Sequence, residues 1–225
     1  KDIDFLSLLK RLEVLNLAFN QIEELSPLGS NTALRVLNLS QNNIADITAL
    51  DSLNQLTELD LGNNNITEIS ALRSMNQLEH LYLNNNNISD IEPMSGSLEL
   101  REIDLSNNRI QTIEHLVNLQ GLWRLFLDHN PIDSIEPLLD LSELELISLK
   151  GIGRLTCETV MLLIQETGRE AVIVDGGCVE SSLQLSGDFE LSANARNRNE
   201  ICSCSESHGV SPVEFQPDDA ATPVC

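Results

Sequence analysis

The chain has 225 residues and is strongly acidic, because 35 acidic against 13 basic side chains give a formal net charge of −22. Such a field repels phosphate backbones and anionic lipid surfaces, so we expect no nucleic-acid partner. The sequence has no apolar run of about 18 residues or more, so it predicts no transmembrane segment. Only 3% of the residues are aromatic, which leaves Leu and Ile to build the core.

Leucine recurs every 22 residues without an insertion, and a constant period of this kind indicates a repeat architecture. The recurring residues are Leu12, Leu34, Leu56, Leu78, Leu100, Leu122 and Leu144. With each of these as position one, the unit reads LxxLxLxxNxIxx[IL]xxLxxL, and it predicts an array over residues 1–151. Ile3 and Leu6 fit the tail of an earlier unit, so we interpret a chain that opens at Lys1 as a fragment or a processed form.

The LxL centre of each unit predicts a short strand whose alternate side chains point inward, and successive units align these strands into a parallel sheet. Proline recurs at position sixteen, as Pro27, Pro93 and Pro137, and favours tight turns over an α-helix on the return side. The pattern resembles the leucine-rich repeat. It predicts an α/β repeat solenoid, a right-handed leucine-rich-repeat superhelix with a concave parallel β-sheet and short turns or 3-10 segments on the convex face.

Position nine of the unit is asparagine in six successive units. An inward asparagine can donate and accept hydrogen bonds at once, so it can satisfy backbone groups where the chain turns away from the strand. We expect a structural ladder of Asn20, Asn42, Asn64, Asn86, Asn108 and Asn130. Within "NNNN", residues 84–87, only Asn86 then belongs to the ladder, while Asn84 and Asn85 face solvent and Asn87 lies on the turn.

The runs "NNISDIEPM", "NNITEISAL" and "NPIDSIEPL" resemble the repeats of bacterial internalins. The 22-residue unit is also similar to that of the eukaryotic phosphatase-regulatory subclass. The resemblance implies a binding module whose concave face engages another protein. Alternatives are a structural spacer or adhesive domain of a larger cell-surface protein and an intracellular phosphatase-type regulatory scaffold.

Two units depart from the pattern at position twenty, where Asn31 and Ser97 replace a large apolar residue. We expect local distortion there, with Leu98 as a candidate substitute for Ser97.

Residues 152–178 are predicted to form a C-terminal cap, because the open end of a solenoid otherwise exposes its core. Thr156 can cap a helix with Val160, Leu163 and Ile164 on its apolar side, and Gly168 can stop it. The run "AVIV", residues 171–174, is predicted to be a short buried strand.

Cys157 and Cys178 bracket this cap, and a bridge between them resembles the disulfide-closed caps of secreted bacterial leucine-rich-repeat proteins. The alternative is two buried free thiols in a cytosolic protein. With the bridge, the expected location is extracellular, at the cell surface or periplasmic, and without it cytoplasmic.

Residues 179–225 lose the period and are predicted to be an acidic, partly disordered tail or linker, with a candidate hairpin at residues 183–191. Cys202, Cys204 and His208 are soft metal ligands, but a closed zinc site needs four ligands, and Cys225 can pair with either cysteine instead. We therefore expect no metal and no cofactor. The chain has five cysteines, so one is unpaired or has a partner elsewhere.

Positions three, five, seven and eight of the unit are expected to face outward on the concave sheet, with His129 at position eight. Tyr82 and Phe126 stand at position five of the fourth and sixth units. Trp, Tyr and Arg are enriched in interface hot spots. The candidate partner-binding residues are His80, Tyr82, Asp104, Trp123, Arg124, Phe126 and His129. The alternative is that Phe126 and Tyr82 only cover the sheet, or that Trp123 packs under the loop.

Catalysis is not expected, although His80, Asp104 and Ser106 on neighbouring units could suggest a triad. An open strand surface offers no oxyanion hole and no pocket that excludes water. The sequence also lacks a nucleophile elbow, a phosphate-binding loop and an H-E-x-x-H motif.

Overall fold

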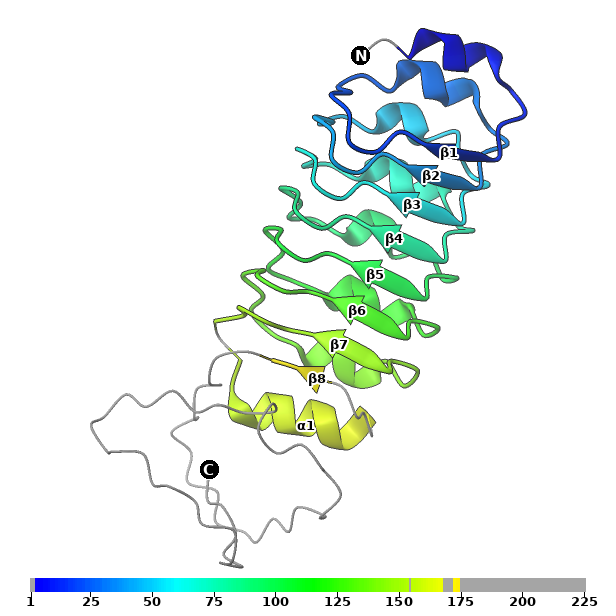
Figure 1. The fold of residues 1–225 in the computed structure, drawn as a ribbon. Coiled ribbons are helices and arrows are strands. Elements are labelled where there is room, and N and C mark those ends of the chain that lie inside the picture. Colours follow the sequence, from blue (N-terminus) through cyan, green and yellow to red (C-terminus); the bar gives the residue numbers. More distant parts are fainter. Residues whose placement is uncertain (1–2, 154, 168–171, 175–225) are drawn as a thin grey trace, which may run out of the picture.

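The computed structural model describes residues 3–153, 155–167 and 172–174 of the chain, and it consists of stacked coils along one parallel sheet. Eight strands follow one another in sequence order (Figure 1). They are β1 (Val14–Asn16), β2 (Val36–Asn38), β3 (Glu58–Asp60), β4 (His80–Tyr82), β5 (Glu102–Asp104), β6 (Arg124–Phe126), β7 (Leu146–Ser148) and β8 (Val172–Ile173).

The strands pair with the register that the 22-residue period predicts. Leu59 lies opposite Leu81, and Leu81 lies opposite Ile103, on adjacent parallel strands. The same offset relates all of the first seven strands. The predicted columns of equivalent side chains are therefore confirmed.

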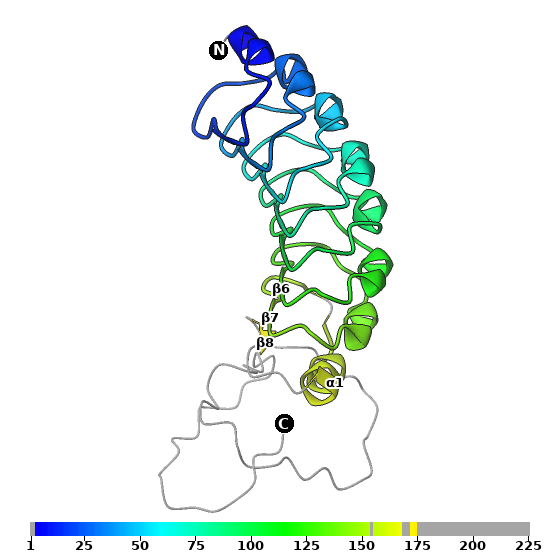
Figure 2. The same cartoon turned by 90° about the vertical axis from the view of Figure 1, so that its right-hand side faces the viewer.

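The return side of each coil is a short 3-10 helix, as the sequence predicts. The seven such helices of the described residues are η1 (Asp4–Leu8), η2 (Ser26–Ser30), η3 (Thr48–Leu50), η4 (Ser70–Ser74), η5 (Glu92–Met94), η6 (Glu114–Asn118) and η7 (Glu136–Asp140). Proline stands in the first turn of η2, η5 and η7, where its fixed φ fits and its missing amide is not needed. Figure 2 shows these helices on the convex side and the strands on the concave side of a curved stack.

The core is a continuous stack of Leu and Ile between the sheet and the 3-10 helices, and Leu37, Leu59 and Leu81 are fully buried within it. Asn31 and Ser97 are buried as well, at position twenty. Asn31 there donates to the carbonyl oxygens of Leu6 at 3.0 Å and Leu9 at 2.8 Å. Leu98 does not substitute for Ser97, because it is 58% exposed.

The position-nine asparagines join each coil to the one before it. The Nδ2 group of Asn86 donates to the carbonyl oxygens of Leu61 and Leu83, both at 3.0 Å, and its Oδ1 accepts from the Ile66 amide at 3.0 Å. Equivalent contacts are made by Asn42, Asn64, Asn108 and Asn130. Asn20, in the first full unit, donates to carbonyl oxygens of its own coil.

Position eight of every unit has a left-handed backbone, which the sequence analysis did not foresee. The residues are Phe19, Gln41, Asn63, Asn85, Asn107 and His129, with φ between 54° and 57°, and Gly151 at 68°. Asparagine and glycine tolerate this region best, so the turn explains why Asn85 precedes the ladder residue Asn86. Phe19 is unusual there, because a bulky side chain disfavours positive φ.

The end of the array is covered by α1 (Cys157–Thr167) and β8. The Thr156 hydroxyl accepts from the amide of Thr159 at 3.2 Å, which is the contact expected of a helix cap. Val160 and Leu163 are buried, and α1 packs against η7. Strand β8 pairs with β7, so it extends the sheet by one rung.

Several predictions lie outside the described residues: the stop at Gly168, the position of Cys178, the candidate hairpin at residues 183–191 and the tail at 179–225. Within the described ranges, no helix has the length and apolar content to cross a membrane.

Candidate functional site

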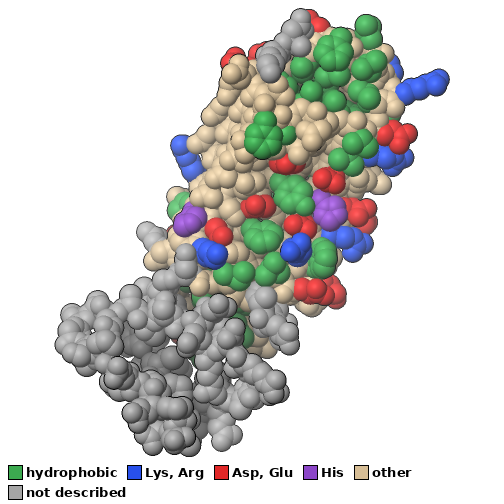
Figure 3. All heavy atoms as spheres, in the orientation of Figure 1, with side chains coloured by type: hydrophobic (Ala, Val, Ile, Leu, Met, Phe, Trp, Pro, Cys, Tyr) green, Lys and Arg blue, Asp and Glu red, His purple; other side chains and the backbone are tan. Residues whose placement is uncertain are grey.

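Two columns of side chains on the concave face carry most of the candidate residues. Strand pairing places His80, Glu102 and Arg124 side by side at position three. It places Tyr82, Asp104 and Phe126 side by side at position five. We call these six residues, with Trp123 at the start of the same rung as Phe126, the concave cluster. Figure 3 shows acidic, basic and hydrophobic side chains interspersed over the strand face of the middle and later coils.

Glu102 is the centre of the position-three column. Its Oε2 lies 3.3 Å from Nη1 of Arg124 and 3.9 Å from Nδ1 of His80. The Arg124 guanidinium carbon lies 5.7 Å from the centre of the Trp123 ring, within range of a cation–π contact. Trp123 remains 39% exposed, so this contact leaves part of the ring accessible to a partner.

Tyr82 lies half-buried in a negative field. Burial, followed by the charges of Glu102 and Glu58, raises the pKa of its hydroxyl to about 12. Asp60 on the neighbouring rung also disfavours the phenolate. The hydroxyl is therefore a neutral donor at ordinary pH.

Asp104 stands between the two aromatic residues of its column. Burial raises the pKa of this carboxyl group, while hydrogen bonds from Ser106 lower it. Its Oδ1 accepts from the Ser106 amide at 2.9 Å. The three residues that could suggest a triad do not form one, because Ser106 is bonded to Asp104 while the carboxylate facing His80 belongs to Glu102.

Position five of β1, β2, β3 and β5 carries a residue that supports the turn. The Oδ1 atoms of Asn16, Asn38, Asp60 and Asp104 each accept from the position-seven amide two residues later, at 2.9–3.0 Å. Tyr82 and Phe126 occupy the same position and have no oxygen that could replace this acceptor. Alignment of the position-five column in the sequence alone would have revealed these two exceptions, with Ser148 as a third residue that is neither Asn nor Asp.

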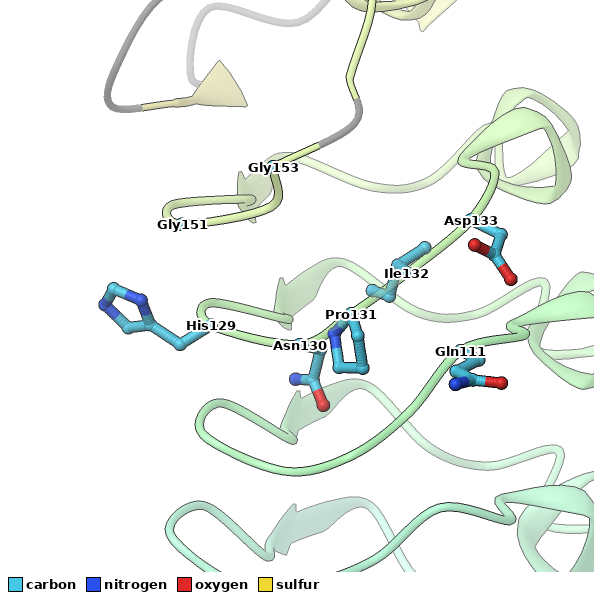
Figure 4. A pocket seen from close by; sticks show the side chains of 8 residues that line it. All are labelled: Gln111, His129, Asn130, Pro131, Ile132, Asp133, Gly151 and Gly153. Atoms are coloured by element: carbon cyan, nitrogen blue, oxygen red, sulfur yellow. The ribbon is translucent and has the colours of Figure 1, made fainter.

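His129 lies apart from the concave cluster, in the left-handed turn after β6. It lines an open pocket of about 540 Å³ together with Gln111, Asn130, Pro131, Ile132, Asp133, Gly151 and Gly153. In Figure 4 its ring points away from the coil, toward the side where Gly151 of the next coil lies. The sequence predicted that position eight faces outward with the strand residues, but His129 lies in the left-handed turn that follows β6.

The cysteine and metal predictions fall largely on other parts of the chain. Cys157 begins α1, but Cys178, Cys202, Cys204, His208 and Cys225 lie outside the described residues. The pairing of Cys157 with Cys178 therefore stays a prediction. The described part of the chain contains no group of three His, Cys, Asp or Glu side chains placed to hold a metal ion.

Comparison with protein families agrees with the coil geometry. A family model described as "Leucine Rich repeats (2 copies)" matches residues 10–52, 32–74 and 54–96, and one described as "Leucine rich repeat" matches residues 77–132. Together they span residues 10–132, which is more than half of the chain. The chain belongs to the leucine-rich repeat family.

Solved leucine-rich repeat structures include two internalins similar to this chain. An internalin (inlF) from Listeria monocytogenes str. 4b F2365 has 29% sequence identity and a TM-score of 0.70, covering 75% of this chain and 49% of that one. Internalin C2 (inlC2) from the same strain has 29% identity and a TM-score of 0.58, covering 64% of this chain and 74% of that one. A search of curated proteins gave no match.

This leucine-rich repeat chain spans about half of the length of the first internalin. The family and these neighbours support a general role in protein interaction, on a fold that typically serves as a binding scaffold and not as an enzyme.

Proposed function

We propose that the chain binds another protein through the concave cluster on β4, β5 and β6. The observation that carries this proposal is the position-five column. Where β1, β2, β3 and β5 have an Asn or Asp whose oxygen accepts from the turn, β4 and β6 have Tyr82 and Phe126. Positions that give up a local stabilising contact without gain to the fold are frequently functional.

The composition of the chain supports the same surface. The protein has one Tyr and one Trp, and both Tyr82 and Trp123 belong to the concave cluster. Large aromatic residues and arginine supply most of the energy in many protein interfaces. Arg124 lies over the Trp123 ring, so the cluster already contains an arginine and aromatic pair.

The experiment replaces the two aromatics by the residue that the column prefers. Tyr82→Asn and Phe126→Asn restore an oxygen that can accept from the turn, as Asn38 does in β2, so we expect both variants to fold. Each immobilised variant is exposed to a protein extract, and retained proteins are identified by mass spectrometry. We expect proteins retained by the unsubstituted chain to be lost from both variants.

A matched control comes from the convex side. Arg73 on η4 pairs with Glu92 at the surface, and Arg73→Ala removes a charged, exposed side chain far from the strands in the unit. We expect this variant to retain the same proteins as the unsubstituted chain. If both asparagine variants still retain the captured proteins and Arg73→Ala loses them, the interaction lies on the convex side and the proposal is refuted.

An extracytoplasmic location also remains part of this proposal. It is supported by the resemblance to internalins and by the predicted bridge between Cys157 and Cys178. A thiol count on denatured, unreduced protein tests it, because a paired cap leaves at most three of the five cysteines reactive.

A further inference from the structure

The position-five column places one carboxylate between two aromatic side chains. Tyr82, Asp104 and Phe126 pair directly across β4, β5 and β6. Because neighbouring strands lie about 4.8 Å apart, the two aromatic residues are about 10 Å apart with Asp104 midway. A planar group that lies over the Asp104 carboxylate can therefore reach the side chains of both aromatic residues.

The charge around Asp104 selects a cation. Strands β3 to β5 carry four carboxylates on the concave face and no Lys or Arg: they are Glu58, Asp60, Glu102 and Asp104. None of the ion pairs between described residues includes Asp104. Arg124, the basic residue on the next rung, is directed to Glu102 instead.

Burial strengthens this preference. Asp104 is half-buried, and burial together with the charges of Asp128 and Glu102 opposes its ionisation. A partner cation relieves that opposition, because an opposite charge within about 4–6 Å favours the ionised carboxylate. Tyr82 lies in the same negative field, which a bound cation also offsets.

Shape distinguishes the two basic side chains. A guanidinium group is planar, stacks on aromatic faces and binds a carboxylate through two parallel hydrogen bonds. An ammonium group is a compact point charge that lacks this planar, two-bonded geometry. The chain itself has one such arrangement nearby, where the Arg124 guanidinium lies over Trp123 and contacts Glu102.

We infer that Tyr82, Asp104 and Phe126 form a receptor for an arginine side chain presented by the partner protein. The guanidinium group lies between the two rings and forms a salt bridge with Asp104. This inference rests on the proposed function, because it names the partner chemistry that the same surface recognises.

The test uses three short peptides with the full chain: acetyl-Gly-Gly-Arg-Gly-Gly-amide and the same peptide with lysine or with citrulline, which is planar but uncharged. Binding is followed by amide NMR shifts of β4 to β6 at low salt. We expect the arginine peptide to bind about tenfold more tightly than the citrulline peptide, since citrulline keeps the planar shape but cannot form a salt bridge with Asp104. We expect the lysine peptide to bind several-fold more weakly than the arginine peptide.

Two variants with equal charge change separate the receptor from the general field. Asp104→Asn and Asp60→Asn each remove one negative charge from position five, where asparagine occurs naturally in β1 and β2. We expect Asp104→Asn to weaken the arginine peptide about tenfold and Asp60→Asn to weaken it less than about threefold. Equal effects of the two variants, or equal binding of the lysine and arginine peptides, would overturn the inference.

The two proposals fail in different ways. If the asparagine variants of Tyr82 and Phe126 lose the captured protein but the arginine peptide does not bind, the receptor inference is wrong and the docking proposal stands. If the arginine peptide binds with the expected dependence on Asp104 while capture is insensitive to both aromatics, the receptor stands and the docking proposal fails.

Discussion

The substitution Asn86→Ala tests whether the asparagine ladder holds adjacent coils together. It removes two donated hydrogen bonds of 3.0 Å and a longer one of 3.4 Å to the Asn84 carbonyl oxygen, but the carbonyl oxygens of Leu61 and Leu83 keep contacts from the neighbouring ladder asparagines. The Ile66 amide, in contrast, loses the acceptor that lies 3.0 Å away. The main loss is therefore that the buried amide of Ile66 is left without a hydrogen-bond acceptor.

The expected cost follows from the three contacts of 3.0 Å. A buried polar group left without a partner costs about 1–3 kcal/mol, and each lost hydrogen bond whose acceptor keeps another donor costs about 0.5–1.5 kcal/mol. The sum is a loss of about 2–6 kcal/mol in the free energy of unfolding. At a urea slope of about 2 kcal/mol per molar, the midpoint falls by about 1–3 M.

Urea unfolding followed by the fluorescence of Trp123, the single tryptophan, measures this shift. Asn84→Ala is the matched control, because Asn84 belongs to the same run of asparagines but is directed to the concave face and is only half-buried. We expect its effect to stay within about 0.5 kcal/mol. Equal midpoints for the two variants would refute the ladder as the origin of the stability.

Phe19→Asn is expected to stabilise the chain by about 1 kcal/mol, because Phe19 is 74% exposed at a φ of 57°, and a lowered urea midpoint would contradict this. Thr156→Ala is expected to cost about 1 kcal/mol through the lost bond from the Thr159 amide, and an unchanged midpoint would argue against the cap. Tyr82 is the single tyrosine, so its ultraviolet titration should report a pKa of about 12 that falls in Glu102→Gln. Folding raises this pKa, so the contribution of Tyr82 to the free energy of unfolding is complete below about pH 10 and is lost as the pH rises through about 12. A titration at the ordinary pKa of tyrosine would contradict the half-buried position of the hydroxyl.

The period predicted the strand register and the columns, because every coil repeats the same apolar spacing, and the prolines at position sixteen predicted the tight turns of the convex side. The period did not reveal the left-handed turn at position eight. That position demands a backbone angle and not a side-chain type, so Phe19, Gln41 and His129 occupy it alongside three asparagines. For the same reason, the sequence pattern predicted that His129 lies with the strand residues, although it belongs to the turn that follows β6.

The sequence predicted which residues of the candidate site lie on adjacent strands, but not which of their side chains contact one another. Columns place Arg124 near both Asp104 and Glu102, and only side-chain geometry shows that Glu102 is the carboxylate it pairs with. The repeat pattern likewise did not predict the hydrogen bond that Asp104 accepts from the Ser106 amide. Such pairings depend on rotamers and burial, which a repeat unit does not encode.

The ladder and the outward columns have separate tasks in each coil. Asn86 and its equivalents bind backbone atoms that every coil possesses, so they impose no condition on which side chains stand at positions three and five. A lineage can therefore exchange or duplicate whole coils, and so acquire a new recognition surface, while the joints between coils stay the same.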